Sequence, residues 1–252
     1  MTALSGVVGR SVALLRAIAD DAGDGVTTSH LAQRIGVPRP TVHRLLESLE
    51  AEGMVDRDRR TGRWYLGPEM YVLGAASAPR YDIVEKAAAG VRRLASETGE
   101  SAFFSLRRGD HTVVLMREDG DFPIRSYVLY EGARFPLGVV SAGLVVLAYL
   151  SDKDIDTYLR RADLTKTYGR AHRTSEIKQR IARTREDGYA VNPGLIVEGS
   201  WGMAAAVFDS HHAPIGALTL TGIESRFSAD RQPRLGRLLL QEANRLSRLV
   251  NR

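Results

Sequence analysis

Arginine, threonine and histidine side chains gather near the N-terminus in types and spacing that suit contact with a nucleic acid. If the segment after Pro38 is a helix, Arg39 and Arg44 lie on its exposed face. Each guanidinium can then donate two hydrogen bonds to a guanine edge or a phosphate. Thr41 on the same face can contact a base edge or a phosphate. His43 lies toward the flank and suits either role. The chemistry indicated is recognition of double-stranded DNA.

A second basic group follows in a turn-rich stretch. It combines four arginines with two aspartates: Arg57, Arg59, Arg60 and Arg63 with Asp56 and Asp58. Such a tip suits contact with phosphates or with a minor groove. Charge alone does not decide the matter, because residues 27–67 hold seven arginines against five acidic residues. The alternative is a helical module that binds protein and has solvated arginines, but the order of the elements favours DNA.

The elements around these side chains are those of a winged helix-turn-helix. Thr27 is a good N-cap for a short helix, and Gly36 supplies the positive φ that ends it. Pro40 suits the first turn of the next helix, where a missing N–H costs nothing. Two short β-segments, Met54-Val55 and Trp64 to Leu66, enclose the basic tip as a wing. Apolar residues of the two helices are spaced to face inward: Leu31, Ala32, Ile35, Val42, Leu45, Leu46 and Leu49.

Further helices are predicted on both sides of this unit. An apolar stripe with helical spacing precedes it: Val8, Val12, Leu15 and Ile18. After it, Pro68 to Ala78 is predicted to be a connecting helix that Pro79 ends. We therefore expect three parts: a winged helix-turn-helix DNA-binding domain over 1–67, a linker helix over 68–80 and a further domain over 81–252.

The last part alternates strand and helix patterns, which predicts an α+β fold with a sheet and flanking helices. Strands are expected at Phe103–Leu106, His111–Met116, Ile124–Leu129, Gly202–Phe208 and Ile215–Thr221. Helices are expected at Ile83–Glu97, Val139–Leu150, Asp152–Arg160, Ser175–Glu186 and about Ala229–Val250.

Two threonines on the last predicted strand are spaced for ligand binding. Thr219 and Thr221 are two residues apart, so their hydroxyls lie on one side and Leu218 and Leu220 on the other. N–H donors where the helix begins near Ser141 would favour an anion. Aromatic side chains are available as walls: Tyr127, Phe135 and Trp201. The alternative is that threonine is simply a good strand residue and the aromatics fill the core, and spacing alone favours this.

The composition excludes several other classes of function. The 252 residues include no cysteine, so disulfides, thiol nucleophiles and cysteine zinc sites are excluded. The net charge of +5 is compatible with a nucleic-acid partner. No apolar run is long enough for a membrane span and no secretory signal is seen, so we expect a cytoplasmic protein.

Enzyme motifs are missing as well. Ser141 lies in Val-Val-Ser-Ala-Gly, which is not the strained elbow of a serine hydrolase. The pair His211-His212 lies in a predicted turn, with no third ligand at usable spacing for a metal. No phosphate-binding glycine loop occurs. We expect no catalytic residue, no metal and no cofactor.

The chain resembles the IclR-type transcriptional regulators. The resemblance rests on GVPRPTVHRLLESLEAEGMVDRD from Gly36, RWYLGPEMYVLG from Arg63 and EGARFPLGVVSAGLVVLAYLS from Glu131. It continues with REDGYAVNP from Arg185 and GMAAAVFDSHHAPIGALTLTGIESRF from Gly202. These motifs stand in the family's order and span nearly the whole chain.

The resemblance implies a GAF-like effector-binding domain after the linker helix. It also implies a homodimer or a dimer of dimers on a palindromic operator, with repression or dual regulation, and DNA contacts that include Ser11, Thr28 and Pro40. By the same matching, the effector pocket comprises Tyr127, Phe135, Ser141, Asn192, Ser200, Gly202, Thr219 and Thr221. Effectors of the family are often aromatic or short organic acids.

This chain departs from the family pattern near the expected pocket. Asn192 stands where an acidic residue is common, and Gly202 where several members have cysteine. Leu144-Val145 replaces a frequent Lys-Ala, and Pro40 replaces a frequent serine in the DNA-binding part. These changes lead us to expect a roomier, neutral polar site for an aromatic or other bulky carboxylate. The alternatives are a ligand-independent regulator with a vestigial sensor domain and, less favoured, an enzyme that uses the C-terminal pocket.

Overall fold

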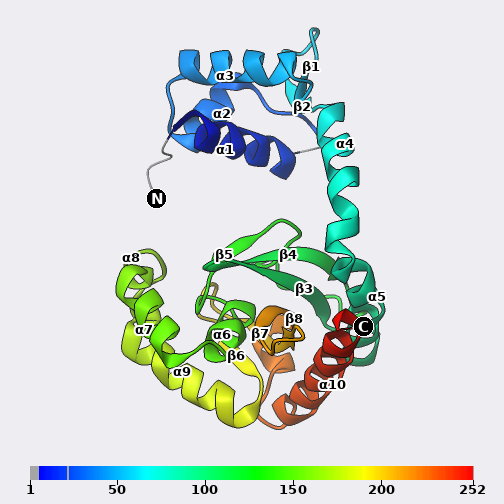
Figure 1. The fold of residues 1–252 in the computed structure, drawn as a ribbon, viewed down its shortest axis with the longest axis vertical. Coiled ribbons are helices and arrows are strands. Elements are labelled where there is room, and N and C mark those ends of the chain that lie inside the picture. Colours follow the sequence, from blue (N-terminus) through cyan, green and yellow to red (C-terminus); the bar gives the residue numbers. More distant parts are fainter. Residues whose placement is uncertain (1–5, 22, 252) are drawn as a thin grey trace. The chain divides into compact units, whose positions relative to one another are not determined.

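The computed structural model describes residues 6–21 and 23–251 and divides the chain into two compact units. The first unit ends at Tyr81 and the second begins at Asp82 (Figure 1). In the described ranges, no helix is both long and apolar enough to cross a membrane.

The first unit is a winged helix-turn-helix, as predicted. Its elements are α1 (Gly6–Asp20), α2 (Thr28–Ile35), α3 (Arg39–Ala51), β1 (Val55–Arg57), β2 (Trp64–Leu66), α4 (Pro68–Ser77) and a 3₁₀ turn (Ala78–Tyr81). Strands β1 and β2 pair antiparallel around the turn at 58–63 and form the wing. The expected division of this unit into a domain over 1–67 and a separate linker helix stays a prediction.

The turn between α2 and α3 forms for the reasons expected. The Thr27 hydroxyl accepts a hydrogen bond from the His30 N–H at 3.3 Å and caps α2. Gly36 ends the helix in the left-handed region, at φ 67°. Pro38 precedes α3 and Pro40 occupies its first turn, so the missing N–H groups leave the helix ladder intact.

The core of this unit surrounds Trp64, which is fully buried. The buried side chains of α1 are Leu14, Ala17 and Ile18. The predicted stripe through Val8 is therefore wrong at its start, because the Val8 side chain is 77% exposed. The helical spacing was correct, but the face that packs on α2 and α3 passes through Leu14 and Ile18, which are one turn apart.

The second unit is an α+β fold built on a six-stranded antiparallel sheet with the order β5-β4-β3-β8-β7-β6. The strands are β3 (Ser101–Arg108), β4 (His111–Glu118), β5 (Arg134–Pro136), β6 (Ala190–Pro193), β7 (Ser200–Phe208) and β8 (Pro214–Ile223). The helices are α5 (Ile83–Thr98), α6 (Ser141–Ala148), α7 (Asp152–Arg161), α8 (Leu164–Tyr168), α9 (Thr174–Asp187) and α10 (Gln232–Val250). Short 3₁₀ turns lie at Arg170–His172 and Glu224–Arg226.

Each face of this sheet carries a core of its own. On one face, α5 and α10 lie side by side over β3, β7 and β8 (Figure 1). On the other face, α6 crosses the sheet beneath α9. Every residue of α6 is buried, which explains why the helix is apolar all round rather than striped. The second face holds the candidate ligand site described below.

One predicted strand of this unit is wrong. Residues 124–129 form an irregular loop, and the strand beside β4 is the three-residue β5 instead. Pro123 removes a backbone donor directly before the predicted strand, and Ile124 is 56% exposed. Strands as short as β5 and β6 carry too little alternation for detection, so the sequence did not indicate them.

Candidate functional site

Helix α3 presents the arginines expected to read DNA. Arg39 and Arg44 are exposed, and neither side chain has a hydrogen bond or ion pair to another described residue. Thr41 and His43 are half-buried beside them. His43 lies 3.5 Å from the Glu47 carboxylate, one turn along the helix. The face therefore offers two unengaged guanidinium groups next to shorter polar side chains, a combination that suits a DNA groove.

The tip of the wing is organised by one carboxylate. Asp58 accepts hydrogen bonds from the Arg60 N–H at 2.8 Å, the Thr61 N–H at 3.3 Å and the Thr61 hydroxyl at 2.8 Å. These bonds, the Thr61 hydroxyl first, hold the pKa of Asp58 below its usual value. The ionised carboxylate thus fixes the turn that carries Arg59 and Arg60.

The four wing arginines have different roles in the structure. Arg57 lies over the Trp64 ring at 5.4 Å. Arg63 donates to the carbonyls of Asp24 at 3.0 Å and Gly25 at 2.8 Å, so it ties the wing to the α1–α2 loop. Arg59 and Arg60 are exposed, and their guanidinium groups have no partner within the described part of the chain. Of the four, these two are free to contact a phosphate.

The structural role of Arg63 leads to a prediction. Arg63→Ala should lower the free energy of unfolding of the first unit by about 1–2 kcal/mol, because two hydrogen bonds to backbone carbonyls are lost. Arg59→Ala removes the same charge from an exposed position and should leave stability unchanged. Urea denaturation of both variants measures the difference. Equal stabilities would show that the tie to the α1–α2 loop contributes nothing.

Three further residues expected at the DNA interface have distinct surroundings. Thr28 accepts a hydrogen bond from the Trp64 indole at 3.0 Å, which leaves its hydroxyl proton for another acceptor. Pro40 is exposed in the first turn of α3, and Ser11 is half-buried on α1. Their contact with DNA stays a prediction.

A small cavity lies between the start of α6 and strands β6, β7 and β8. Five of the eight residues expected in the effector pocket line it: Ser141, Asn192, Ser200, Gly202 and Thr221. Its free volume is about 20 Å³, enough for a single water molecule. The roomier site that the sequence led us to expect is therefore not present in this structure. We call this space the polar cavity.

Two buried hydroxyls without partners lie in and next to the polar cavity: Thr221 lines the cavity, and Thr219 is two residues away on the same strand. Thr219 and Thr221 point to the α6 side of the sheet, and neither hydroxyl has a hydrogen-bond partner in the described structure. Helix α6 begins after Val140 without a side-chain cap, and Ser141 in its first turn lines the polar cavity. Gly202 lies opposite, and a Cβ there would stand 3.1 Å from the Ser141 hydroxyl. The glycine thus keeps space beside Ser141.

Asn192 has a positioning role. Its amide donates to the Val139 carbonyl at 2.8 Å and accepts from the Leu195 N–H at 3.1 Å. Both ends of the carboxamide are therefore engaged by the backbone. The residue holds the chain just ahead of α6 against the β6–β7 connection. Its second amide N–H and the second lone pair of its carbonyl remain for a ligand.

Two aromatic residues expected in the pocket lie outside the polar cavity. Tyr127 is 72% exposed because the predicted strand around it is a loop. It lines an outer groove of about 860 Å³ with Val128 and Ser200, which also line the polar cavity. Phe135 lies on β5, at the opposite edge of the sheet from β6. A hydrogen bond between the Ser126 and Ser200 hydroxyls joins the loop to β7 at the boundary between groove and cavity.

The sequence reasoning missed His172. Its ring is buried, with Nε2 3.2 Å from the Val139 carbonyl and Nδ1 3.0 Å from the Tyr168 carbonyl. Asn192 donates to the same Val139 carbonyl, so both side chains hold the start of α6. No motif indicated this role, because the contact joins residues 33 positions apart.

His172 should make stability depend on pH. Burial lowers its pKa from the usual value, against the effect of its two carbonyl neighbours. The unfolded chain takes up a proton below about pH 6.5 while the folded chain resists it, so stability falls as pH drops below that value. Urea denaturation across this range should show a shallower loss for His172→Gln than for the wild type. Parallel losses would remove His172 as the cause.

One unit is a winged helix-turn-helix with unengaged arginines, and the other is an α+β unit with a polar cavity. This combination is that of a DNA-binding transcriptional regulator. The chain belongs to the IclR family. The model of the IclR helix-turn-helix domain matches residues 7–59, and that of the bacterial transcriptional regulator IclR C-terminal domain matches residues 75–248.

Individual proteins agree with this assignment along most of their length. The transcriptional repressor IclR of Escherichia coli is 27% identical over 240 residues, which cover 94% of this chain and 87% of the relative. The crystal structure of an IclR regulator from Alicyclobacillus acidocaldarius matches with a TM-score of 0.80 at 25% identity, covering 97% of this chain and 98% of that one. An IclR homologue from Microbacterium hydrocarbonoxydans in complex with 4-hydroxybenzoate shares the fold, with a TM-score of 0.76 at 18% identity and coverage of 96% and 98%.

Proposed function

We propose that this protein represses transcription from an operator to which its affinity is controlled by a small organic acid. The observation that carries the ligand part is the partnerless hydroxyl of Thr221, which lines the polar cavity, with the partnerless Thr219 hydroxyl next to it on the same face of β8. A buried hydroxyl without a partner costs about 1–3 kcal/mol, so retaining two is explained if a ligand supplies the missing partner. Helix N-termini favour anions, which indicates a carboxylate.

The DNA part rests on α3 and the wing. Arg39, Thr41 and Arg44 read base edges in the major groove, and Arg59 and Arg60 contact phosphates. His43, Ser11, Thr28 and Pro40 complete the contact set. One α3 reads one half-site, so two copies of the chain bind a palindromic operator. The repressor assignment is supported by relatives that carry that name.

The ligand is an aromatic carboxylate. The homologue from Microbacterium hydrocarbonoxydans was crystallised with 4-hydroxybenzoate, which supports this class for the same fold. A molecule of this size requires the polar cavity to open into the outer groove, which shares Val128 and Ser200 with it. Breaking the Ser126–Ser200 hydrogen bond is the smallest change that joins the two spaces.

Ligand binding changes the spacing of the two DNA-binding units of a dimer through the helix α4. Any such effect requires different ligand affinities in the DNA-bound and free states. Asn192 on β6 supplies the local part of that difference, because its amide holds the chain ahead of α6.

Mapping the genomic sites bound by the protein supplies the operator for a test. Fluorescence anisotropy at fixed salt then measures operator affinity with 4-hydroxybenzoate, benzoate and acetate. The aromatic acids should change the affinity and stabilise the protein against heat, whereas acetate should do neither. A response to two- and three-carbon acids alone would overturn the ligand class.

The small volume of the polar cavity favours a second candidate, a regulator that binds its operator without a ligand. In that case operator affinity stays constant with every acid in the series. The same titration therefore separates the two candidates, because operator binding persists in both.

A further inference from the structure

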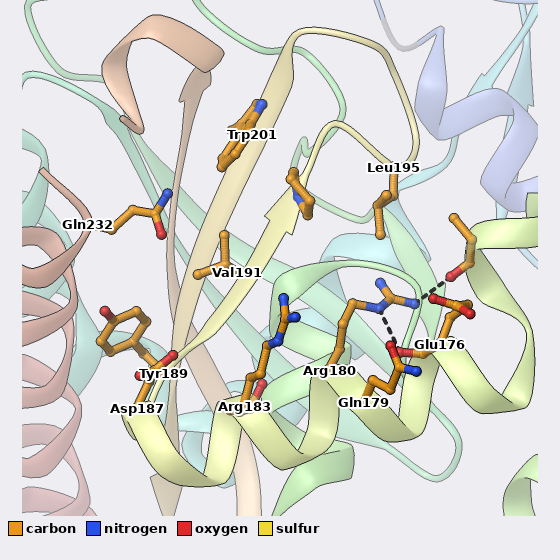
Figure 2. A pocket seen from close by; sticks show the side chains of 13 residues that line it. Glu176, Gln179, Arg180, Arg183, Asp187, Tyr189, Val191, Leu195, Trp201 and Gln232 are labelled. Atoms are coloured by element: carbon orange, nitrogen blue, oxygen red, sulfur yellow. Dashed lines mark hydrogen bonds between the residues drawn. The ribbon is translucent and has the colours of Figure 1, made fainter. Parts of the chain in front are cut away.

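A second, larger cavity lies on the α9 side of strand β6 and has a free volume of about 440 Å³. Trp201 is the one residue that lines both this space and the polar cavity. The residues that matter come from α9, from the connections before and after β6, from β7 and from the start of α10: Arg180, Arg183, Tyr189, Leu195, Trp201 and Gln232. Figure 2 shows the two arginines rising from α9 toward β6, with Tyr189, Trp201 and Gln232 around the remaining sides.

Arg180 is a partly buried cation without a counter-ion. Its Nη2 donates to the Ala171 carbonyl at 2.9 Å and its Nε to the Glu176 carbonyl at 3.4 Å. Its Nη1 is covered and has no hydrogen-bond partner in the described chain. No carboxylate of the described residues lies within ion-pair distance, and burial lowers the pKa of this guanidinium despite the nearby Glu176 charge.

A buried, unpaired guanidinium is costly. Buried charges in proteins are normally paired, since an unpaired one loses hydration without compensation. A neutral carbonyl at 2.9 Å compensates only in part. The cost is explained if an anion occupies the cavity in the functional protein.

A second cation stands on the same face of α9. Arg183 lies three residues from Arg180, which places both on one side of the helix. Its side chain is exposed and forms no ion pair in the described chain. Two carboxylates also line the cavity, Glu176 and Asp187, but neither is paired with an arginine there. Two unpaired guanidinium groups at one cavity suit the two oxygens of a carboxylate.

The remaining lining favours a flat organic body. Tyr189 is held rigidly, since a Cβ on Gly236 would stand 2.2 Å from its ring. Trp201 supplies a second aromatic surface, and the Gln232 amide donates to the Phe227 carbonyl at 2.8 Å, which leaves its carbonyl oxygen as an acceptor. The volume of about 440 Å³ lies within the range of small-molecule sites.

We propose that this cavity is a second ligand site, specific for a carboxylate on a planar organic body, with Arg180 Nη1 and Arg183 as the anion-binding groups. Because Nη1 is covered, a carboxylate reaches it only after a lining side chain moves aside. The Leu195 N–H bonds to Asn192, which holds the start of α6, so an occupant here bears on the polar cavity. The site does not depend on ligand binding in the polar cavity.

Benzoate is a suitable probe, with benzamide as its uncharged counterpart. The chain has two tryptophans, so the Trp201 indole signal can be followed by NMR once Trp201→Phe has assigned it. Benzoate should shift this signal saturably and benzamide should not. Arg180→Gln should weaken the benzoate affinity about tenfold or more, because a charge-assisted pair is lost. Ser141→Ala, which alters only the polar cavity, should leave the Trp201 titration unchanged.

Two controls keep the outcome decisive. Arg248→Gln removes an exposed arginine from α10 and should not alter benzoate affinity. Thermal unfolding without ligand should show that Arg180→Gln folds with a midpoint close to that of the wild type, because the loss of two carbonyl hydrogen bonds opposes the removal of a partly buried unpaired charge. The proposal is overturned if Ser141→Ala loses the Trp201 response or if Arg180→Gln keeps it unchanged. An equal response to benzamide also overturns it.

Discussion

Replacing Arg44 with alanine should weaken binding to the specific operator by about 1–3 kcal/mol, or roughly tenfold to a hundredfold, if its guanidinium reads a base edge. The structure leaves this group exposed at the first half of α3 and without a partner in the described ranges. Binding to non-specific DNA should weaken much less, because on such DNA Arg44 contributes only a charge interaction with one phosphate. Anisotropy with operator and scrambled fragments at several salt concentrations measures both.

Two matched variants define the controls for Arg44. Arg248→Ala removes one exposed arginine from α10 and should leave both affinities unchanged. Ser48→Ala alters the same helix one turn on, but the Ser48 hydroxyl already donates to the Arg44 carbonyl at 3.0 Å, so its loss should matter little. Equal losses on both DNAs, with the salt slope reduced by about 1, would make Arg44 a phosphate contact instead.

Replacing Thr219 and Thr221 with valine should stabilise the ligand-free protein and abolish its response to an acid. Each substitution removes a buried hydroxyl without a partner and retains the side-chain shape. Each should raise the free energy of unfolding by about 1 kcal/mol or more. The ligand-dependent change in operator affinity should disappear, while operator binding without ligand persists.

Thr98→Val is the matched control, with the opposite expected sign. Its buried hydroxyl donates to the Leu94 carbonyl at 2.6 Å and accepts from the Glu100 N–H at 3.1 Å. Its removal leaves the buried Glu100 N–H without this partner and should lower stability by about 1–3 kcal/mol. If valine at 219 and 221 also destabilises the protein, the hydroxyls are satisfied in solution and the ligand argument from them fails.

Local signals sufficed for the first unit. The Thr27 cap, the Gly36 turn and the proline start of α3 act within a few residues of each other, so sequence reasoning located α2 and α3 correctly. The fold class of the second unit also followed from the alternation of strand and helix patterns. The strand expected at 124–129 does not form, because β5, which lies farther along the chain, pairs with β4 instead.

The residue types, the turn chemistry and the order of elements were thus determined by the sequence alone, since these depend on neighbouring residues. The tertiary structure decided which arginines have no hydrogen-bond partner among the described residues. Arg63 is engaged by carbonyls 38 and 39 residues away, and Arg59 is not. The same holds for Thr219, Thr221 and Arg180, whose missing partners become apparent only once distant segments bury them. Burial and hydrogen bonding between distant segments are properties of packing, which no local pattern encodes.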